Sequence, residues 1–121
     1  MAKQMLIIWT NPEAWAQMSQ DEQQQLFKEY FEYTQWLQEK GWFEHGDPLQ
    51  PPARTVRVRD GKTDVTDGPF AETKEFLGGY YMLDCTPEEA IEAAAKLPDV
   101  RFGAVEVHEV MSIEGAPGGP S

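Results

Sequence analysis

Acidic, basic and turn-forming residues are concentrated in one stretch of the sequence, DGPFAETKEFLGGYY, which begins at Asp67. Lys74 could bind a carboxylate or polarise a carbonyl group. Asp67 or Glu72 could act as a base if burial raised its pKa toward neutrality. The hydroxyls of Tyr30 and Tyr80 could donate hydrogen bonds to a developing oxyanion. Together these side chains are typical of proton abstraction next to a carbonyl group, as an isomerase or a lyase performs it.

The same stretch also has a purely structural interpretation. Asp67 can fold back onto the backbone as an Asx turn, and the Gly-Pro pair that follows fixes a bend. Glu72 and Lys74 would then form an ion-pair network that stabilises the loop or a dimer interface. Charge-rich turns are common and the sequence shows no spacing of nucleophile and base, so this interpretation is favoured over catalysis. Ligand binding without turnover is as well supported as a structural role.

A second group of polar side chains lies near the C-terminus, in GAVEVHEVM. The alternation predicts a strand in which Glu106 and His108 share one face and two valines share the other. Glu106 and His108 could line a pocket, although a cross-strand hydrogen bond is favoured. The Glu-His-Gly-Asp run from Glu44 has metal-capable atoms but no recognised ligand spacing, so a solvated loop is favoured there. No metal site and no cofactor are predicted.

The composition limits the class of protein. With 121 residues, 40% of them hydrophobic and 26% charged, the chain fits one globular domain, which we place at 1–113, with a flexible tail expected at 114–121. The formal charge of −11 argues against nucleic acid, which needs a clustered basic face. No apolar run reaches the roughly 18 residues of a membrane span. The single cysteine, Cys85, agrees with a cytoplasmic protein.

Local signals divide the chain into helices and strands. The segments SQDE, from Ser19, and TPEE, from Thr86, have the form of capping boxes, and each precedes an apolar repeat at helical spacing. Asp60-Gly61 is the preferred two-residue turn of a hairpin. The predicted elements are a strand over 5–9, a helix over 19–40, a loop over 42–53, a hairpin over 54–66, a strand over 78–85, a helix over 86–97 and a strand over 103–111.

The order of these elements predicts a ferredoxin-like α+β subunit, with an antiparallel sheet and both helices on one face. The other face mixes polar with apolar residues in the last strand, which suits a dimer whose two sheets face each other around a pocket. The residues expected to face the core are those that recur at helical spacing: Leu26, Phe27, Tyr30, Phe31, Thr34 and Leu37 in the first helix, and Ala90, Ile91, Ala94 and Leu97 in the second.

The longest motifs of the chain resemble those of a known family. LQPPARTVRVRDGK, DGPFAETKEFLGGYYMLD and GAVEV resemble the DGPF branch of the YCII-related family, and the resemblance extends from Met5 to Met111. It implies a dimeric α+β barrel of ferredoxin-like subunits, similar in shape to muconolactone isomerases. Better-known YCII-like proteins suggest a His–Asp pair in a pocket. Asp99 matches the aspartate, whereas the helix has no histidine and Tyr30 is the nearest occupant of that position.

Three hypotheses about function follow. The first is a homodimeric small-molecule-binding or regulatory domain with a pocket near the DGPF loop. The second is an acid–base enzyme, isomerase-like or lyase-like, that acts on a small carbonyl or lactone compound. The third comes from the resemblance, because DGPF proteins tend to accompany extracytoplasmic-function sigma factors, which implies a protein partner in that signalling. The candidate catalytic residues are Asp67, Glu72 and Lys74, and the candidate ligand-binding residues are Tyr30, Tyr80, Glu106 and His108.

Overall fold

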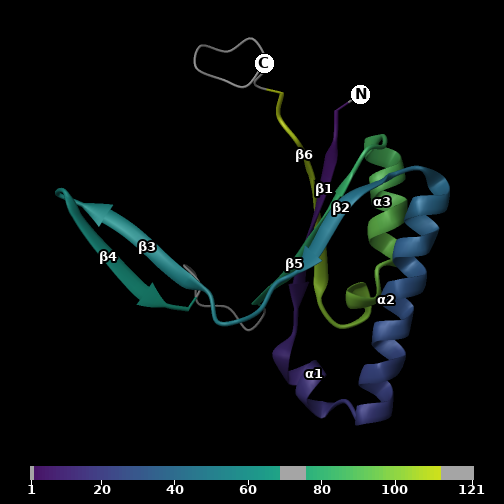
Figure 1. Ribbon diagram of the computed structural model, residues 1–121, viewed down its shortest axis with the longest axis horizontal. Coiled ribbons are helices and arrows are strands. Elements are labelled where there is room, and N and C mark those ends of the chain that lie inside the picture. The colour runs from purple at the N-terminus through teal and green to yellow at the C-terminus, as the bar shows by residue number, and fades with distance from the viewer. Residues whose placement is uncertain (1, 69–75, 113–121) are drawn as a thin grey trace.

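A four-stranded antiparallel sheet with helices on one face forms the body of the molecule, and a two-stranded hairpin stands apart from it (Figure 1). The computed structural model describes residues 2–68 and 76–112, so the expected tail at 114–121 lies outside it. The elements are β1 (Gln4–Thr10), α1 (Pro12–Gln17), α2 (Gln20–Lys40), β2 (Phe43–Pro48), β3 (Arg54–Arg59), β4 (Lys62–Asp67), β5 (Phe76–Leu83), α3 (Pro87–Lys96), η1 (Pro98–Arg101) and β6 (Ala104–Glu109).

The strand order confirms the predicted fold class. The sheet runs β2-β5-β1-β6, and every neighbouring pair is antiparallel. The two strands at the centre are joined to the two edges by split βαβ connections, which is the ferredoxin-like arrangement. No helix in the described part of the chain is long and apolar enough to cross a membrane.

Both predicted capping boxes are present and fix where the long helices begin. The Ser19 hydroxyl accepts from the backbone N–H of Glu22 at 3.1 Å, and the Glu22 carboxylate accepts from the N–H of Ser19 at 3.0 Å. Thr86 and Glu89 make the same reciprocal pair before α3. Each pair satisfies two backbone donors that a helix N-terminus would otherwise leave open. At the other end of α2, Gly41 adopts the left-handed conformation (φ 76°) and ends the helix.

The core lies between the two long helices and one face of the sheet. Leu6 and Ile8 of β1 are buried there, while Met5, Ile7 and Trp9, which alternate with them, are only partly covered. From α2, Tyr33 reaches across the core and its hydroxyl donates to the backbone carbonyl of Ala93 in α3 at 2.7 Å. Burial raises the pKa of Tyr33 well above its ordinary value. This hydrogen bond ties the two helices together inside an apolar layer.

Three residues that we expected to face the core are exposed instead. Phe27, Phe31 and Ile91 keep 60%, 67% and 62% of their surface. The stripe that each helix buries is narrower than its apolar face, because the buried residues are Leu26, Tyr33 and Leu37 in α2 and three alanines in α3. Ile91 lies outside the stripe that these alanines form and so faces away from the core.

The prediction of a loop over 42–53 is wrong for its first half. Residues Phe43–Pro48 form β2, which pairs with β5 at the edge of the sheet. Gly and Pro lower strand propensity, but pairing with a neighbouring strand overrides them, and Pro48 is tolerated at the end of an edge strand. The short helix α1 was also not expected. Asn11 accepts from the N–H groups of Glu13 and Ala14 and so caps a helix where the sequence indicated only the end of a strand.

Two glycines allow β2 and β5 to lie very close together. A Cβ atom on Gly79 would sit 2.8 Å from the backbone oxygen of Asp47, and one on Gly46 would sit 2.8 Å from that of Tyr80. Both distances are shorter than a carbon–oxygen contact permits. A Cβ on Gly78 would meet the Thr10 side chain at 3.3 Å, which is a milder contact. Of these two adjacent glycines, Gly79 is therefore the one that the pairing of β2 with β5 requires.

We expect Gly79→Ala to lower the free energy of unfolding by about 1–3 kcal/mol, because the new methyl group forces β2 away from β5. Gly78→Ala is the matched control and should cost clearly less. Urea denaturation of the two variants and the wild type checks this. Equal losses in the two variants would contradict the close approach of β2 and β5.

Candidate functional site

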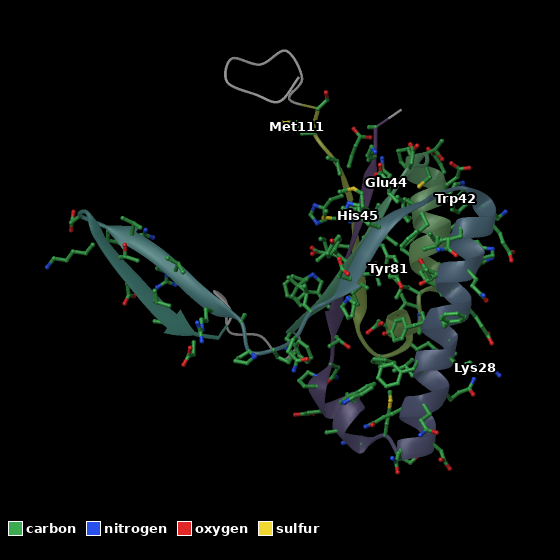
Figure 2. All side chains as sticks on the ribbon, in the orientation of Figure 1. Lys28, Trp42, Glu44, His45, Tyr81 and Met111 are labelled. Atoms are coloured by element: carbon green, nitrogen blue, oxygen red, sulfur yellow. The ribbon has the colours of Figure 1, made fainter. Side chains whose placement is uncertain are left out.

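The face of the sheet opposite the helices, here called the open face, collects most of the polar side chains that could do chemistry. Residues that alternate with the buried ones of each strand lie on it, because neighbours along a strand point to opposite faces. Figure 2 shows His45 on this side of the sheet, away from the helices. The open face consists of His45 and Asp47 of β2, Leu77, Tyr80 and Met82 of β5, Met5, Ile7 and Trp9 of β1, and Ala104, Glu106 and His108 of β6.

The register aligns these residues in two rows that cross all four strands. In the first row, Tyr80 is paired with Asp47 on one side and with Ile7 on the other, and Ile7 is paired in turn with Glu106. The second row has the same form and reads His45, Met82, Met5 and His108. Each row is polar at its two ends, and its inner positions are apolar except for Tyr80, which belongs to the polar border on the β2 side. The open face therefore has an apolar floor between two polar borders.

On the β2 and β5 side, a chain of hydrogen bonds joins three side chains. The Tyr80 hydroxyl donates to the Asp47 carboxylate at 3.0 Å, and its oxygen lies 3.2 Å from Nδ1 of His45. The His45 and Tyr80 rings also meet edge to face, with centroids 5.6 Å apart. The hydrogen bond to Asp47 raises the pKa of the Tyr80 hydroxyl, because a phenolate beside a carboxylate is disfavoured. Tyr80 thus remains a proton donor over a wide pH range.

On the β1 and β6 side, one carboxylate joins two ring nitrogens. The Trp9 indole N–H donates to Glu106 at 2.5 Å, and the same oxygen of Glu106 lies 3.7 Å from Nε2 of His108. Glu106 and His108 are exposed on an edge strand, whereas Trp9 is partly covered. The carboxylate is therefore oriented by the indole and remains able to accept a further hydrogen bond.

The structure separates the two tyrosines that the sequence had suggested as joint hydrogen-bond donors. Tyr80 lies on the open face, while Tyr30 extends from α2 and packs against the core on the other side of the sheet. The two hydroxyls therefore cannot meet at one ligand within a single chain. Glu106 and His108, by contrast, share the open face with Tyr80, as the alternation of the last strand indicated.

None of the candidate catalytic residues of the DGPF stretch is found on the open face in the described part of the chain. Asp67 is exposed at the end of β4, where it pairs with Arg54 at the base of the hairpin. It does not belong to the open face. Glu72 and Lys74 lie outside the described residues, so their suggested roles remain predictions. The described end of the stretch belongs to β5, which brings Tyr80 to the open face.

Asp99 is the most deeply buried acid in the described part of the chain. It is 3% exposed, and it sits in η1 on the helix side of the sheet. The Thr10 hydroxyl donates to its Oδ2 at 2.9 Å, while Oδ1 has no hydrogen-bond partner among the described residues. Burial raises the pKa of the Asp99 carboxyl, against smaller opposing effects of Thr10 and Arg101. These contacts fix the η1 turn to the end of β1.

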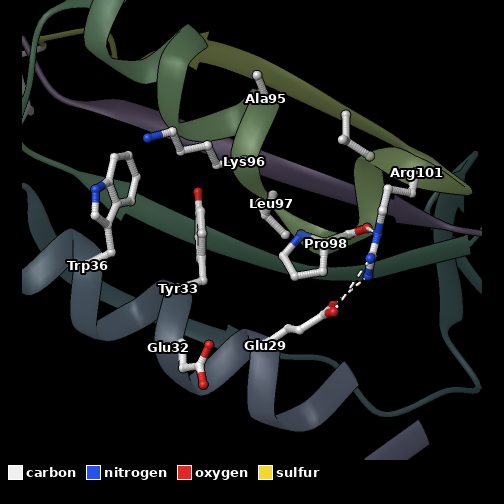
Figure 3. A pocket seen from close by; sticks show the side chains of 10 residues that line it. Glu29, Glu32, Tyr33, Trp36, Ala95, Lys96, Leu97, Pro98 and Arg101 are labelled. Atoms are coloured by element: carbon white, nitrogen blue, oxygen red, sulfur yellow. Dashed lines mark hydrogen bonds and ion pairs between the residues drawn. The ribbon is translucent and has the colours of Figure 1, made fainter. Parts of the chain in front are cut away.

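A groove of about 380 Å³ lies on the helix side, between α2 and η1 (Figure 3). The charged side chains that line it interact with other residues of the same chain. Arg101 and Glu29 form an ion pair at 2.5 Å across one end, and the Lys96 ammonium lies 4.4 Å from the centre of the Trp36 ring at the other. The predicted site residues Tyr80, Glu106 and His108 lie on the open face and not in this groove, so the open face is the better candidate for a functional site.

His45 and Asp47 are the site residues that the sequence analysis missed. The sequence predicts a solvated loop there, and a loop implies no common orientation for the two side chains. Their spacing of two residues, with the apolar Phe43 preceding them, was the available signal, since residues two apart share a face of a strand. That signal is weak in a segment that also contains Gly46 and Pro48.

The comparisons with known proteins identify the family. The model of the YCII-related domain matches residues 3–114, so the chain belongs to the YCII-related family. A protein of Rhizobium meliloti described as uncharacterized is 47% identical over 58 residues. That match covers 46% of this chain and 47% of the relative, so it spans about half the length of each protein.

We expect Asp47→Asn to lower the pKa of Tyr80, because the amide cannot repel the phenolate as the carboxylate does. Titrating the tyrosine absorbance, and subtracting the titration of a Tyr80→Phe variant, isolates this group. Glu44→Gln, which removes a neighbouring carboxylate of β2 that pairs with Lys3, should leave the titration unchanged. A Tyr80 pKa that does not respond to Asp47→Asn would contradict the hydrogen bond.

Asp99 should make the protein more stable at acidic than at neutral pH. Its pKa is raised in the folded state, so its contribution is fully present below the ordinary aspartate pKa of about 3.9 and is lost as the pH rises through the folded value. Asp99→Asn removes this titration. As the pH rises from the ordinary aspartate pKa through the raised pKa of the folded state, the variant's free energy of unfolding in urea should therefore fall less than that of the wild type.

Asp64→Asn, which makes the same substitution at an exposed position of β4, is the control for the substitution itself. An Asp99→Asn variant with the wild-type pH dependence would show that Asp99 titrates alike in the folded and unfolded chains.

Proposed function

We propose that this protein is a homodimeric small-molecule-binding domain whose ligand lies on the open face. The observation that carries the proposal is the arrangement of the two rows, in which hydrogen-bonding groups border an apolar floor on both sides. Ligand sites of small molecules are built in this way, from apolar walls and a few oriented polar groups. β5 brings Tyr80 to this face directly after the DGPF segment.

The spacing of the strands sets the size of the ligand. Neighbouring strands lie about 4.8 Å apart, so two strand intervals separate Tyr80 from Glu106 by roughly 10 Å at their Cα atoms. With side chains extending inward, this width suits a compound of one ring or a short chain. The carboxylates of Asp47 and Glu106 favour hydroxyl or amino groups at its ends, and Met5, Ile7 and Met82 favour an apolar middle.

A second copy of the chain would turn this face into an enclosed pocket. Met5, Ile7, Trp9 and Met82 are only partly covered in the single chain, and an apolar patch bordered by polar residues is typical of an interface. When two open faces meet, the polar borders of both copies surround one apolar space. Water is then excluded, which strengthens each hydrogen bond to a ligand.

Proton transfer at the same site is the second candidate. The chain from His45 through Tyr80 to Asp47 links an imidazole to a carboxylate through one phenol. His45 would accept the proton from the carbon next to a bound carbonyl group, and the Tyr80 hydroxyl would donate a hydrogen bond to the oxyanion that forms, so that the proton can return from His45 to another carbon of the ligand. This favours an isomerase-like or lyase-like reaction on a ligand that has first bound to the open face.

The proposal is tested by a thermal-shift screen with phenols, aromatic amines, amino alcohols and lactones, and with phenolic acids as compounds that the carboxylates of the open face should disfavour. A compound that binds the folded protein must raise its midpoint of unfolding. We expect Tyr80→Phe to reduce the shift caused by such a compound, because the donor on the open face is lost. Tyr30→Phe is the matched control, since it removes the same hydroxyl on the opposite side of the sheet, and should retain the shift.

Each outcome of the screen separates the candidates. Binding that Tyr80→Phe weakens, without conversion of the compound, supports the binding domain; conversion of the compound supports the enzyme. A shift that Tyr30→Phe abolishes and Tyr80→Phe leaves intact would move the site to the helix side. The absence of any shift would leave a protein partner as the ligand of this face and would overturn the small-molecule proposal.

A further inference from the structure

The β3–β4 hairpin, here called the arm, is built as a separate element. Its two strands pair with each other along their whole length, and neither joins the four-stranded sheet. The turn at Asp60 and Gly61 has the positive φ values (51° and 74°) that suit a tight hairpin. An isolated hairpin of two strands is at best marginally stable in water. The arm therefore needs further contacts to remain folded.

One face of the arm is apolar and exposed. The register pairs Val56 with Val65 and Val58 with Thr63, so these β-branched residues share a face. The three valines keep 61%, 55% and 57% of their surface, in the order Val56, Val65, Val58. β-Branched residues on one face of a strand pair are typical of a surface that packs against something. Nothing in the described part of this chain covers it.

The position of the arm indicates where its partner lies. In Figure 1 the helices lie on one side of the sheet and the arm projects on the other, beside the open face. Its root is held by two hydrogen bonds of 2.7 Å, from the N–H of Gly68 to Ala53 and from the Thr55 hydroxyl to Gly68. A molecule that covers the open face would therefore have the arm alongside it.

The charge of the arm fits a second copy of this chain. The segment 54–67 has four of the ten basic residues and three of the 21 acidic ones. The rest of the chain thus has six bases against 18 acids. The arm thus has a net charge of +1 and the rest of the chain −12, so an arm placed against the body of another copy lessens the repulsion between two acidic bodies.

We propose that the arm clasps a second copy of this chain, with its valine face packed against the copy that covers the open face. The inference rests on the homodimer of the proposed function and goes beyond it, because it assigns part of the interface to an element outside the sheet. In a symmetric pair each chain clasps the other, so two valine faces are buried for each dimer.

Analytical ultracentrifugation of the full chain tests the clasp. The double variant Val56→Thr/Val65→Thr keeps β-branched side chains, and so keeps the hairpin, but places a hydroxyl on the packed surface. We expect it to raise the dissociation constant of the dimer about 10- to 100-fold. Ile91→Thr is the control, since it changes an equally exposed apolar residue on α3, and should leave the constant unchanged.

A third variant, Ile7→Asp, charges the centre of the open face and distinguishes the two proposals. If it dissociates the dimer while the valine variant associates like the wild type, the homodimer stands and the clasp is overturned. If the valine variant dissociates and Ile7→Asp does not, the arm binds a second copy but the open face is not the interface. A wild type that stays monomeric overturns both proposals.

Hydrogen exchange of the wild-type protein tests the clasp without any substitution. The backbone amides of β3 and β4 should exchange slowly at concentrations where the dimer forms and much faster on dilution, because the arm loses its support. Exchange that is independent of concentration would overturn the clasp.

Discussion

The packing of α2 and α3 against one face of the sheet determines how the rest of this protein is arranged. Side chains alternate along a strand, so burying Leu6 and Ile8 under the helices directs Met5, Ile7 and Trp9 to the opposite face. The same alternation in β5 and β6 brings Tyr80 and Glu106 into line with them. The composition of the open face is therefore a consequence of the core, because a shift of one residue in any strand would exchange the two sets.

Features set by neighbouring residues were predictable from the sequence. The two capping boxes, the Asp-Gly hairpin and the alternation of the last strand depend on contacts within a few positions, and the structure has all of them. The fold class followed from their order. β2 was missed because its identity depends on β5, more than 30 residues away, and on a close approach that only Gly46 and Gly79 allow.

The candidate site was predicted only where a strand was recognised. Glu106 and His108 were assigned to one face because the strand around them alternates clearly. No common face is predicted for His45 and Asp47, because Gly46 and Pro48 make the sequence of the strand that orients them typical of a loop. Tyr30 was grouped with Tyr80 on chemical type alone, and the sheet lies between them. The chemical type of a side chain can be taken directly from the sequence. The face of the sheet on which that side chain lies depends on pairing between distant segments.

Both edges of the sheet carry features that oppose strand addition. β2 ends in Pro48, which has no N–H to offer a further strand, and carries Glu44 and Asp47, while β6 carries Glu106 and Glu109 along the opposite edge. Charged residues and proline on edge strands prevent sheets from joining side by side. Copies of this chain are thus discouraged from growing into an open-ended ribbon. Association through faces can close after two copies, so the same acidity that keeps the edges apart favours a finite assembly over a fibre.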